Sequence, residues 1–188
     1  MSDKKYRSDY TLRYDADDKG RIKADAVYTG ALYSFAGSDE SRLAAAERMS
    51  FAVAVAWMLW LLPLLFASGA GHAFYVIFPH VGCGISLWQL TRGIALLHRA
   101  KAPLRREHSE QLKNRLNGGC AVSMALAAVA AVGCAVHLIR TSFETGSTVF
   151  ALAELLLLAA LVVIWRQRQA AATKPYSGET KSADKFLR

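Results

Sequence analysis

Four long stretches of this chain are nearly free of charged residues, and they constrain the fold more than any other feature. They cover residues 51–67, 73–97, 119–139 and 147–165, and each is 17 to 25 residues long. A membrane core about 30 Å thick needs roughly 20 helical residues to cross it. The stretches therefore predict an all-α integral membrane protein with four transmembrane helices, at about 48–68, 73–97, 119–139 and 147–165. A soluble bundle of buried helices is the alternative, although few soluble domains of this size contain even one such stretch.

The charged residues gather beside these stretches in an alternating pattern. Residues 98–117 and residues 166–188 each contain six Lys/Arg and two Asp/Glu, whereas residues 1–48 contain nine of each kind. Residues 68–72 contain no Lys/Arg, and residues 140–146 contain only one. Because basic loops stay in the cytoplasm, both termini of this multi-pass protein are expected on the cytoplasmic side of the cell (plasma) membrane. The polar start predicts that the first span acts as an uncleaved anchor, and the basic balance is no sign of nucleic-acid binding.

The sequence carries no recognisable catalytic or metal-binding motif, so we expect a non-enzymatic protein without a cofactor. Its three cysteines, Cys83, Cys120 and Cys134, fall within predicted spans and form no CxxC pair, which predicts reduced thiols that pack as small apolar groups. No spacing of His, Cys and carboxylate residues resembles a chelating motif. A bis-histidine haem would need His80 and His137 at one depth, but their positions along their spans differ by about 8 Å.

Residues 1–37 predict a small cytoplasmic β-hairpin or three-stranded meander. Apolar and polar residues alternate from Tyr10 to Tyr14, as in a strand with one buried face. The segment 17–20 has turn chemistry, and two further apolar runs follow, the second ending at Phe35. About 30 residues bury little core by themselves, so this module is expected to lean on the bundle or on another protein. A flexible tail is the alternative.

Residues 38–168 are expected to form the four-helix bundle. Ser38 or Asp39 can cap a helix that continues into the first span. The polar segment 98–117 is expected to form a helical hairpin in the cytoplasm between the second and third spans. Residues 169–188 contain Pro, Gly, Ser and Lys, and predict a disordered cytoplasmic tail.

The third span carries the clearest packing signal. Small residues recur at every fourth position and predict a face along which a neighbouring helix approaches closely; they are Gly119, Ser123, Ala127, Ala131 and Ala135. This span is therefore the expected centre of the bundle or of an oligomer interface.

A basic cluster follows the second span and comprises Arg99, Lys101, Arg105 and Arg106. These side chains would lie near anionic lipid headgroups. A topology signal is the simplest interpretation of the cluster, and a specific lipid or partner site is the alternative.

Two ionisable residues lie deep within predicted spans, where a charge is costly and needs a reason. His80 lies eight residues after His72, where the second span begins, and Glu154 lies eight residues after Gly146, where the fourth begins. Both therefore lie roughly 12 Å below the outer surface. The matching depths predict a His80–Glu154 hydrogen bond or ion pair that pins two helices. A proton- or ligand-coupled role, and the absence of any contact, are the alternatives.

Two more polar residues lie toward the cytoplasmic end of the second span. Arg92 is about one and a half turns from that end, so snorkelling of its side chain explains its presence. Gln89 lies one turn away from Arg92 and can line the same face.

Several segments resemble a family of small bacterial four-span membrane proteins of unknown function. They are the β-rich start with Gly20-Arg21 and the run Tyr28 to Phe35, the run Phe74 to His80, and the charged segment Leu104 to Arg115 before an Ala-rich span. The resemblance covers residues 10 to about 165. It implies the four-span fold and its topology, and it implies no activity and no functional residue.

These features favour a non-enzymatic accessory or assembly subunit of a larger membrane complex, such as one for transport. The outer loops are too short for an extracellular domain, and the polar cytoplasmic segments contain no catalytic set. The expected partners are membrane lipids and either another membrane protein or further copies of the chain. The alternatives are a small oligomeric transporter or channel that uses His80 and Glu154, and a membrane enzyme.

Overall fold

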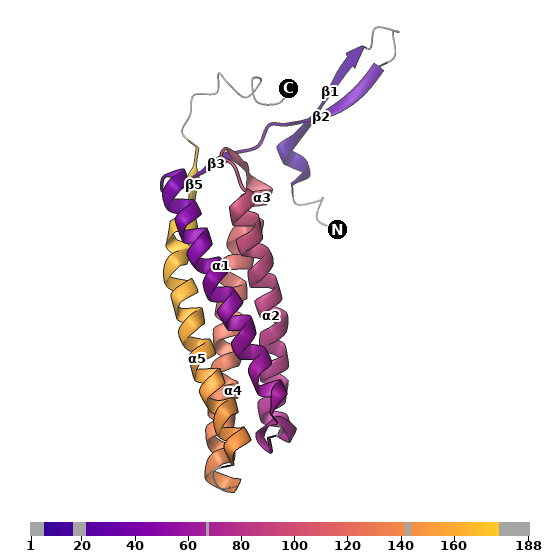
Figure 1. Ribbon diagram of the computed structural model, residues 1–188. Coiled ribbons are helices and arrows are strands. Elements are labelled where there is room, and N and C mark those ends of the chain that lie inside the picture. Colours follow the sequence, from indigo (N-terminus) through magenta and orange to yellow (C-terminus); the bar gives the residue numbers. More distant parts are fainter. Residues whose placement is uncertain (1–5, 17–21, 67, 142–143, 177–188) are drawn as a thin grey trace. The chain divides into compact units, whose positions relative to one another are not determined.

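The computed structural model describes residues 6–16, 22–66, 68–141 and 144–176. The described chain is mostly helical with a small N-terminal β-hairpin, which confirms the predicted fold class at this level (Figure 1). Its residues fall into two compact units. The helix bundle comprises residues 35–100 and 111–172, and the β module comprises the described residues among 1–34, 101–110 and 173–188.

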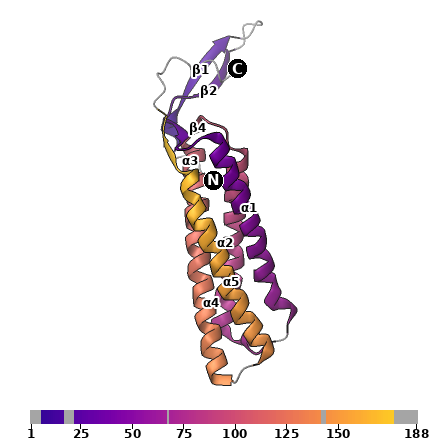
Figure 2. The same ribbon diagram turned by 60° about the vertical axis from the view of Figure 1, so that its left-hand side comes forward.

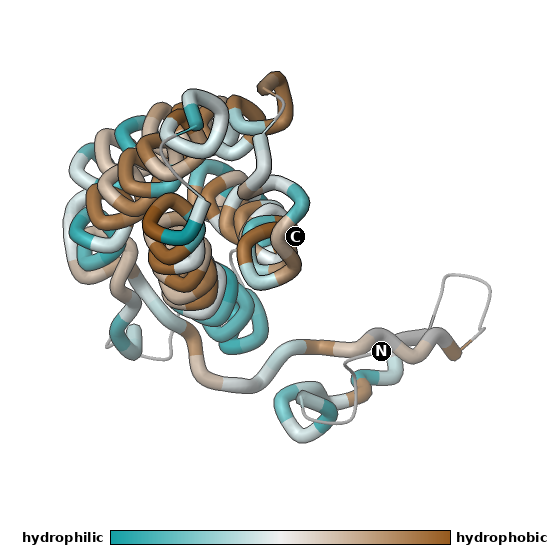
Figure 3. The backbone as a smooth tube through the Cα atoms, turned by 90° about the horizontal axis from the view of Figure 1, so that it is seen from below, coloured by the Kyte–Doolittle hydropathy of each residue, from teal (hydrophilic) through white to brown (hydrophobic). Residues whose placement is uncertain are grey.

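Four long helices make up the bundle and run side by side (Figure 2). They are α1 (Asp39–Leu61), α2 (Phe74–Arg99), α4 (Gly119–Thr141) and α5 (Thr145–Gln167). Helix α4 contacts α2 and α5, and α1 contacts the same two helices from the other side. The core between them is mostly apolar, with fully buried side chains such as Met49, Leu87 and Leu157. Large hydrophobic side chains are also exposed on all four helices. Figure 3 shows the hydrophobic residues as brown segments along the backbone of the bundle.

The ends of α1 follow from two local signals. Ser38, one of the two predicted caps, has extended backbone, and its hydroxyl oxygen accepts a hydrogen bond from the Ser41 N–H at 3.2 Å. At the other end α1 tightens into the 3₁₀-helix η2 (Leu62–Leu65), which contains Pro63 in its first turn, where the missing N–H is tolerated. A second 3₁₀-helix, η3 (Ala70–His72), leads into α2.

Three helical segments are long and apolar enough to cross a membrane: Asp39–Leu65, Arg106–Thr141 and Thr145–Ala171. These segments support association with a membrane. The expected fourth span is not among them. Helix α2 has the necessary length of 26 residues, but Pro79, His80, Gln89 and Arg92 lower its hydropathy.

The segment between α2 and α4 differs from the expected helical hairpin at 98–117. Helix α2 ends at Arg99, and the chain then forms the short strand β4 (Leu104–Arg105). Pro103 disfavours helical backbone in the residue before it, so the helix does not continue through this connection. A single helical stretch begins at Arg106 and comprises α3 (Arg106–Lys113), the π-helical segment η4 (Asn114–Gly118) and α4.

The strands form two sheets, so of the two predicted arrangements the hairpin is present and the three-stranded meander is not. Strands β1 (Tyr10–Ala16) and β2 (Ile22–Tyr28) form an antiparallel hairpin, in register from Tyr10–Tyr28 to Ala16–Ile22. Strand β3 (Leu32–Phe35) instead lies between β4 and β5 (Thr173–Pro175). The extended run at 31–35 was recognisable, but its partners come from segments distant in the sequence.

The tail is ordered further than the sequence predicted. After α5 the chain forms the 3₁₀-helix η5 (Arg168–Ala171) and then β5. The Tyr176 N–H donates to the Leu32 carbonyl at 2.8 Å, which extends the pairing beyond β5. The remainder of the predicted disordered tail, residues 177–188, lies outside the described residues.

Candidate functional site

The candidate site is a buried polar pair in the middle of the bundle. His80 of α2 and Glu154 of α5 are 0% and 1% exposed, and the His80 Nδ1 lies 2.5 Å from the Glu154 Oε1. The two residues that the sequence placed at one depth are therefore in direct contact. A lone ionised group in such surroundings costs a large amount of free energy. The bond between the two side chains offsets most of the cost of burying each of them.

Aromatic rings enclose the imidazole of His80. The indole of Trp60 stacks on it with ring centroids 5.3 Å apart and an angle of 9° between the planes, and Phe150 meets it edge-on at 5.0 Å. The Trp60 Nε1–H donates to the His80 carbonyl at 2.8 Å. The indole can lie this close because Gly84 has no side chain, and a Cβ there would come within 2.5 Å of Trp60 Cζ2. The site is thus built by α1, α2 and α5 together.

Two atoms of the pair have no hydrogen-bond partner among the described residues. They are the His80 Nε2 and the Glu154 Oε2, and both are fully buried. A buried polar atom without a partner costs free energy comparable to a lost hydrogen bond. The pair could therefore carry or exchange a proton, or hold a small hydrogen-bonding molecule.

Close backbone approach joins α2 to α4 at two places that flank His80 along α2. A Cβ on Gly119 would lie 3.1 Å from the Leu90 backbone nitrogen, and one on Gly133 would lie 3.1 Å from the Tyr75 carbonyl oxygen. That carbonyl is available because Pro79, four residues later in α2, has no N–H to donate to it. The small residues of α4 thus permit its backbone to lie close to that of α2.

The predicted packing face of α4 is present in its first half only. Gly119, Ser123 and Ala127 are buried, and the Ser123 hydroxyl lies 2.7 Å from the Ser86 hydroxyl of α2. Ala131 is half-buried and Ala135 is exposed. Each step of four residues turns an α-helix about 40° past a full circle, so a face drawn at every fourth position drifts out of the interface. The buried face continues instead through Ala130, Gly133, Cys134 and His137.

At the end of the bundle where α5 begins, a set of polar contacts, here called the clip, was not predicted from the sequence. The Glu144 carboxylate, just before α5, accepts hydrogen bonds from the Gly69 N–H and the Ser147 hydroxyl, both at 2.9 Å. These bonds, the Gly69 N–H first, lower the pKa of Glu144 below its ordinary value. His137 lies nearby, with its Nδ1 3.3 Å from the Tyr75 hydroxyl. The clip ties the α1–α2 connection to the start of α5.

The basic cluster divides between the two units. Arg99 is exposed at the end of α2, whereas Lys101, Arg105 and Arg106 belong to the β module. Within the module, the Arg105 guanidinium lies over the rings of Tyr10 and Tyr28 at 5.9 and 5.5 Å. Arg106 pairs with Glu110. Two of the four predicted patch residues, Arg105 and Arg106, therefore make contacts within the module.

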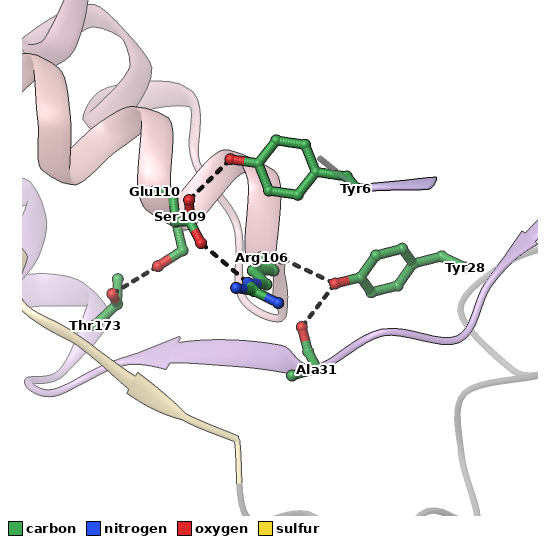
Figure 4. Close-up of polar contacts among 7 residues, drawn as sticks. All are labelled: Tyr6, Tyr28, Ala31, Arg106, Ser109, Glu110 and Thr173. Carbon is green, nitrogen blue, oxygen red and sulfur yellow. Dashed lines mark hydrogen bonds and ion pairs between the residues drawn. The ribbon is translucent and has the colours of Figure 1, made fainter. Parts of the chain in front are cut away.

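A hydrogen-bonded network organises the β module (Figure 4). The Arg106 N–H donates to the Tyr28 hydroxyl at 3.0 Å, and that hydroxyl donates to the Ala31 carbonyl at 2.8 Å. Glu110 accepts from the Arg106 Nε–H at 3.0 Å and from the Tyr6 hydroxyl at 2.9 Å. Burial raises the pKa of Tyr28. These residues fasten the hairpin to the start of α3.

Sequence reasoning missed the aromatic and glycine partners of the pair and the residues of the clip. Trp60 and Gly84 lie in long apolar runs, where nothing distinguishes them from packing residues. Glu144 could have been noticed as the residue before a helix start. Among the described residues, no group of three His, Cys, Asp or Glu side chains is arranged to hold a metal ion.

Comparison of the chain with protein-family models, with curated proteins and with solved structures finds no match.

Proposed function

We propose that this chain is a non-enzymatic integral membrane protein that crosses the membrane four times and serves as an accessory or assembly subunit of a larger membrane complex. The observation that carries the proposal is the sealed interior of the bundle. His80 and Glu154 are buried against each other, and large hydrophobic side chains are exposed on each of the four helices. A bundle whose buried polar side chains bond to each other, and whose exposed side chains are largely apolar, fits a structural role within the membrane.

Helix α2 is the fourth crossing in this proposal. It is about 39 Å long, enough to cross a bilayer core of about 30 Å, and it packs along both α1 and α4. Two of the polar residues that lower its hydropathy face inward, where His80 meets Glu154 and the Ser86 hydroxyl meets that of Ser123. These groups are therefore not presented to lipid.

The outward side chains fit a hydrocarbon solvent. Large exposed hydrophobic residues occur on each helix, including Phe51 and Met58 of α1, Phe74 and Phe78 of α2, Val132 and Ile139 of α4, and Leu155 and Val163 of α5. Exposed apolar surface on this scale is unfavourable in water. The basic residues at the ends of α2 and α5 support an orientation with both termini in the cytoplasm.

Affinity purification of the full chain from its native membrane in mild detergent tests the accessory role. Stoichiometric co-purification of another membrane protein is the expected result. A clean homo-oligomer, or a monomer without any partner, would contradict it. Cysteine labelling of single residues added at either terminus tests the orientation, and labelling from outside the cell would overturn it.

A small oligomeric transporter or channel is the second candidate. The unpartnered His80 Nε2 and Glu154 Oε2 favour it, since a proton-coupled site needs buried groups that can accept or release a proton. Purified protein reconstituted into vesicles with an interior pH dye tests this candidate. Proton flux that Glu154→Gln abolishes would favour it over the accessory role, and flux no greater than that of empty vesicles would remove it.

A further inference from the structure

We propose that the outward face of α2 is the docking surface for a transmembrane helix of a partner membrane protein, and that this helix carries a carboxylate opposite Arg92. The inference rests on the proposed four-span accessory role, and it adds the surface and the chemistry of the partner.

The outward face of α2 forms a single stripe. Its exposed members include Phe74, Phe78, Val81, Ile85, Trp88, Gln89 and Arg92. At 3.6 residues per turn these positions fall within about 100° of one another around the helix. Buried residues of the same helix, such as Cys83 and Leu90, point the other way into the bundle.

The two halves of the stripe differ in chemistry. Toward the start of α2, Phe74 and Phe78 are stacked with ring centroids 5.9 Å apart, and both are more than 70% exposed. Further along, Trp88, Gln89 and Arg92 place an indole N–H, an amide and a guanidinium within five residues. None of these three side chains has a hydrogen-bond or ion-pair partner in the part of the chain that the structure describes.

Lipid alone is a poor environment for this polar half. Snorkelling can relieve Arg92, which lies about 10 Å of helix from the end of α2 at Arg99. It cannot relieve Gln89, whose shorter side chain begins about 15 Å from that end. The outward faces of α4 and α5 carry aliphatic residues instead, including Val129, Val132 and Leu155. The unpartnered polar groups therefore single out α2 as the face that another helix covers.

Charge excludes a second copy of α2 as the occupant. A symmetric pair of parallel α2 helices would place one Arg92 against the other, which is repulsive in a medium of low polarity. The helix that covers this face must instead supply hydrogen-bond acceptors for the Arg92 guanidinium and its polar neighbours.

The other helices of a second copy offer no acceptor at the right depth. Trp57 of α1 donates to Thr91 at 3.0 Å, so Arg92 lies at the depth of Trp57. The nearest acidic residue of α1, Glu47, is ten residues from Trp57, or about 15 Å along the axis. Helix α4 contains no acidic residue, and Glu154 of α5 is buried against His80. A carboxylate from a different membrane protein meets the requirement.

Site-specific photo-crosslinking in the native membrane tests the proposal. The full chain carries p-benzoyl-phenylalanine in place of Ile85 on the α2 face, or in place of Val132 on the α4 face. The two positions are matched, because they are aliphatic and 67% and 64% exposed. Position 85 is expected to give one discrete protein adduct whose crosslinked peptide is an apolar segment containing Asp or Glu. Position 132 is expected to give less than a tenth as much.

The second part of the experiment measures how the adduct depends on the charge of residue 92. Arg92→Leu is expected to reduce the adduct from position 85 at least tenfold, whereas Arg92→Lys retains most of it. Both variants should keep the melting temperature of the purified bundle, because Arg92 is exposed and contributes nothing to its core. That measurement separates loss of docking from loss of folding.

Three results would overturn the inference: equal adducts at both positions, an adduct with a second copy of this chain, or an adduct that Arg92→Leu leaves unchanged. If a partner co-purifies but crosslinks only from another face, the docking surface is wrong and the accessory role stands. If no partner co-purifies and neither position yields a protein adduct, both proposals fail.

Discussion

The helix bundle and the β module satisfy their polar groups in opposite ways. In the bundle, His80 and Glu154 are sealed in an apolar interior and depend on each other. In the module, Tyr28, Arg106 and Glu110 bond through groups that are half-buried or exposed, where water can replace a missing partner. A change of one polar atom should therefore be severe in the bundle and mild in the module.

The largest effect is expected for His80→Ala, which leaves the Glu154 carboxylate buried without its partner. Removal of one member of a buried pair costs about 3–5 kcal/mol, so the unfolding free energy in detergent should fall by that order. Adding Glu154→Gln should restore part of the loss, with a coupling of about 1–3 kcal/mol in a double-mutant cycle. Strictly additive losses would remove the pair as a stabilising contact.

Packing in the bundle should be sensitive to a single added side chain. Gly119→Val would place a Cβ 3.1 Å from the Leu90 backbone nitrogen, which cannot move aside. A loss of about 1–3 kcal/mol in the unfolding free energy is expected from such overpacking. Gly118→Val is the matched control, because nothing lies within 4 Å of a Cβ added there. Equal losses in the two variants would argue against the tight α2–α4 approach.

The module should respond more weakly to Tyr28→Phe. The change removes the hydroxyl that bonds Arg106 and Ala31, at an expected cost of about 0.5–1.5 kcal/mol. Hydrogen exchange of the amides in residues 22–35 should speed up, while the melting temperature of the bundle stays the same. Tyr14→Phe, at a ring that is 65% exposed, should change neither quantity. A lower melting temperature of the bundle in Tyr28→Phe would contradict the expectation that the module and the bundle respond separately.

The smallest effect is expected at the exposed clip of Glu144. Its pKa in the folded protein is lowered from 4.5, so its stabilising contribution is complete at neutral pH and is lost as the pH falls below that value toward the folded pKa. The difference in melting temperature between the natural chain and Glu144→Gln should be constant from pH 7 to about 5.5 and shrink below 4.5. A difference in melting temperature that grows as the pH falls would contradict a stabilising role for the ionised Glu144.

The helices could be predicted because each of them is encoded by neighbouring residues. Long apolar runs predict their existence, and Ser38 marks the start of α1. Matching depths along two spans that start on the same side of the membrane also located His80 beside Glu154, since helix rise converts residue number into depth. The sequence could not supply the stacking of Trp60 on His80, which depends on how α1 lies against α2.

The strands were harder to place because their partners are remote. The meander, one of the two predicted arrangements, would put β3 beside β2, but β3 pairs with β4 and β5, which come about 70 and 140 residues later. Local alternation identifies an extended segment and says nothing about which distant segment it meets. The same limit applies to α4, where a face of period four was read in place of the true helical period, and Ala135 consequently lies outside the contact.

The continuous helix from Arg106 to Thr141 is longer than a bilayer needs. Its 36 residues span about 54 Å, and the hydrocarbon accounts for only about 30 Å of that length. In the proposed topology, roughly 24 Å of the same rod stands in the aqueous phase and includes the π-helical turn at 114–118. A spin label near residue 110 should therefore collide with water-soluble relaxation agents, while one near residue 129 collides with oxygen dissolved in lipid.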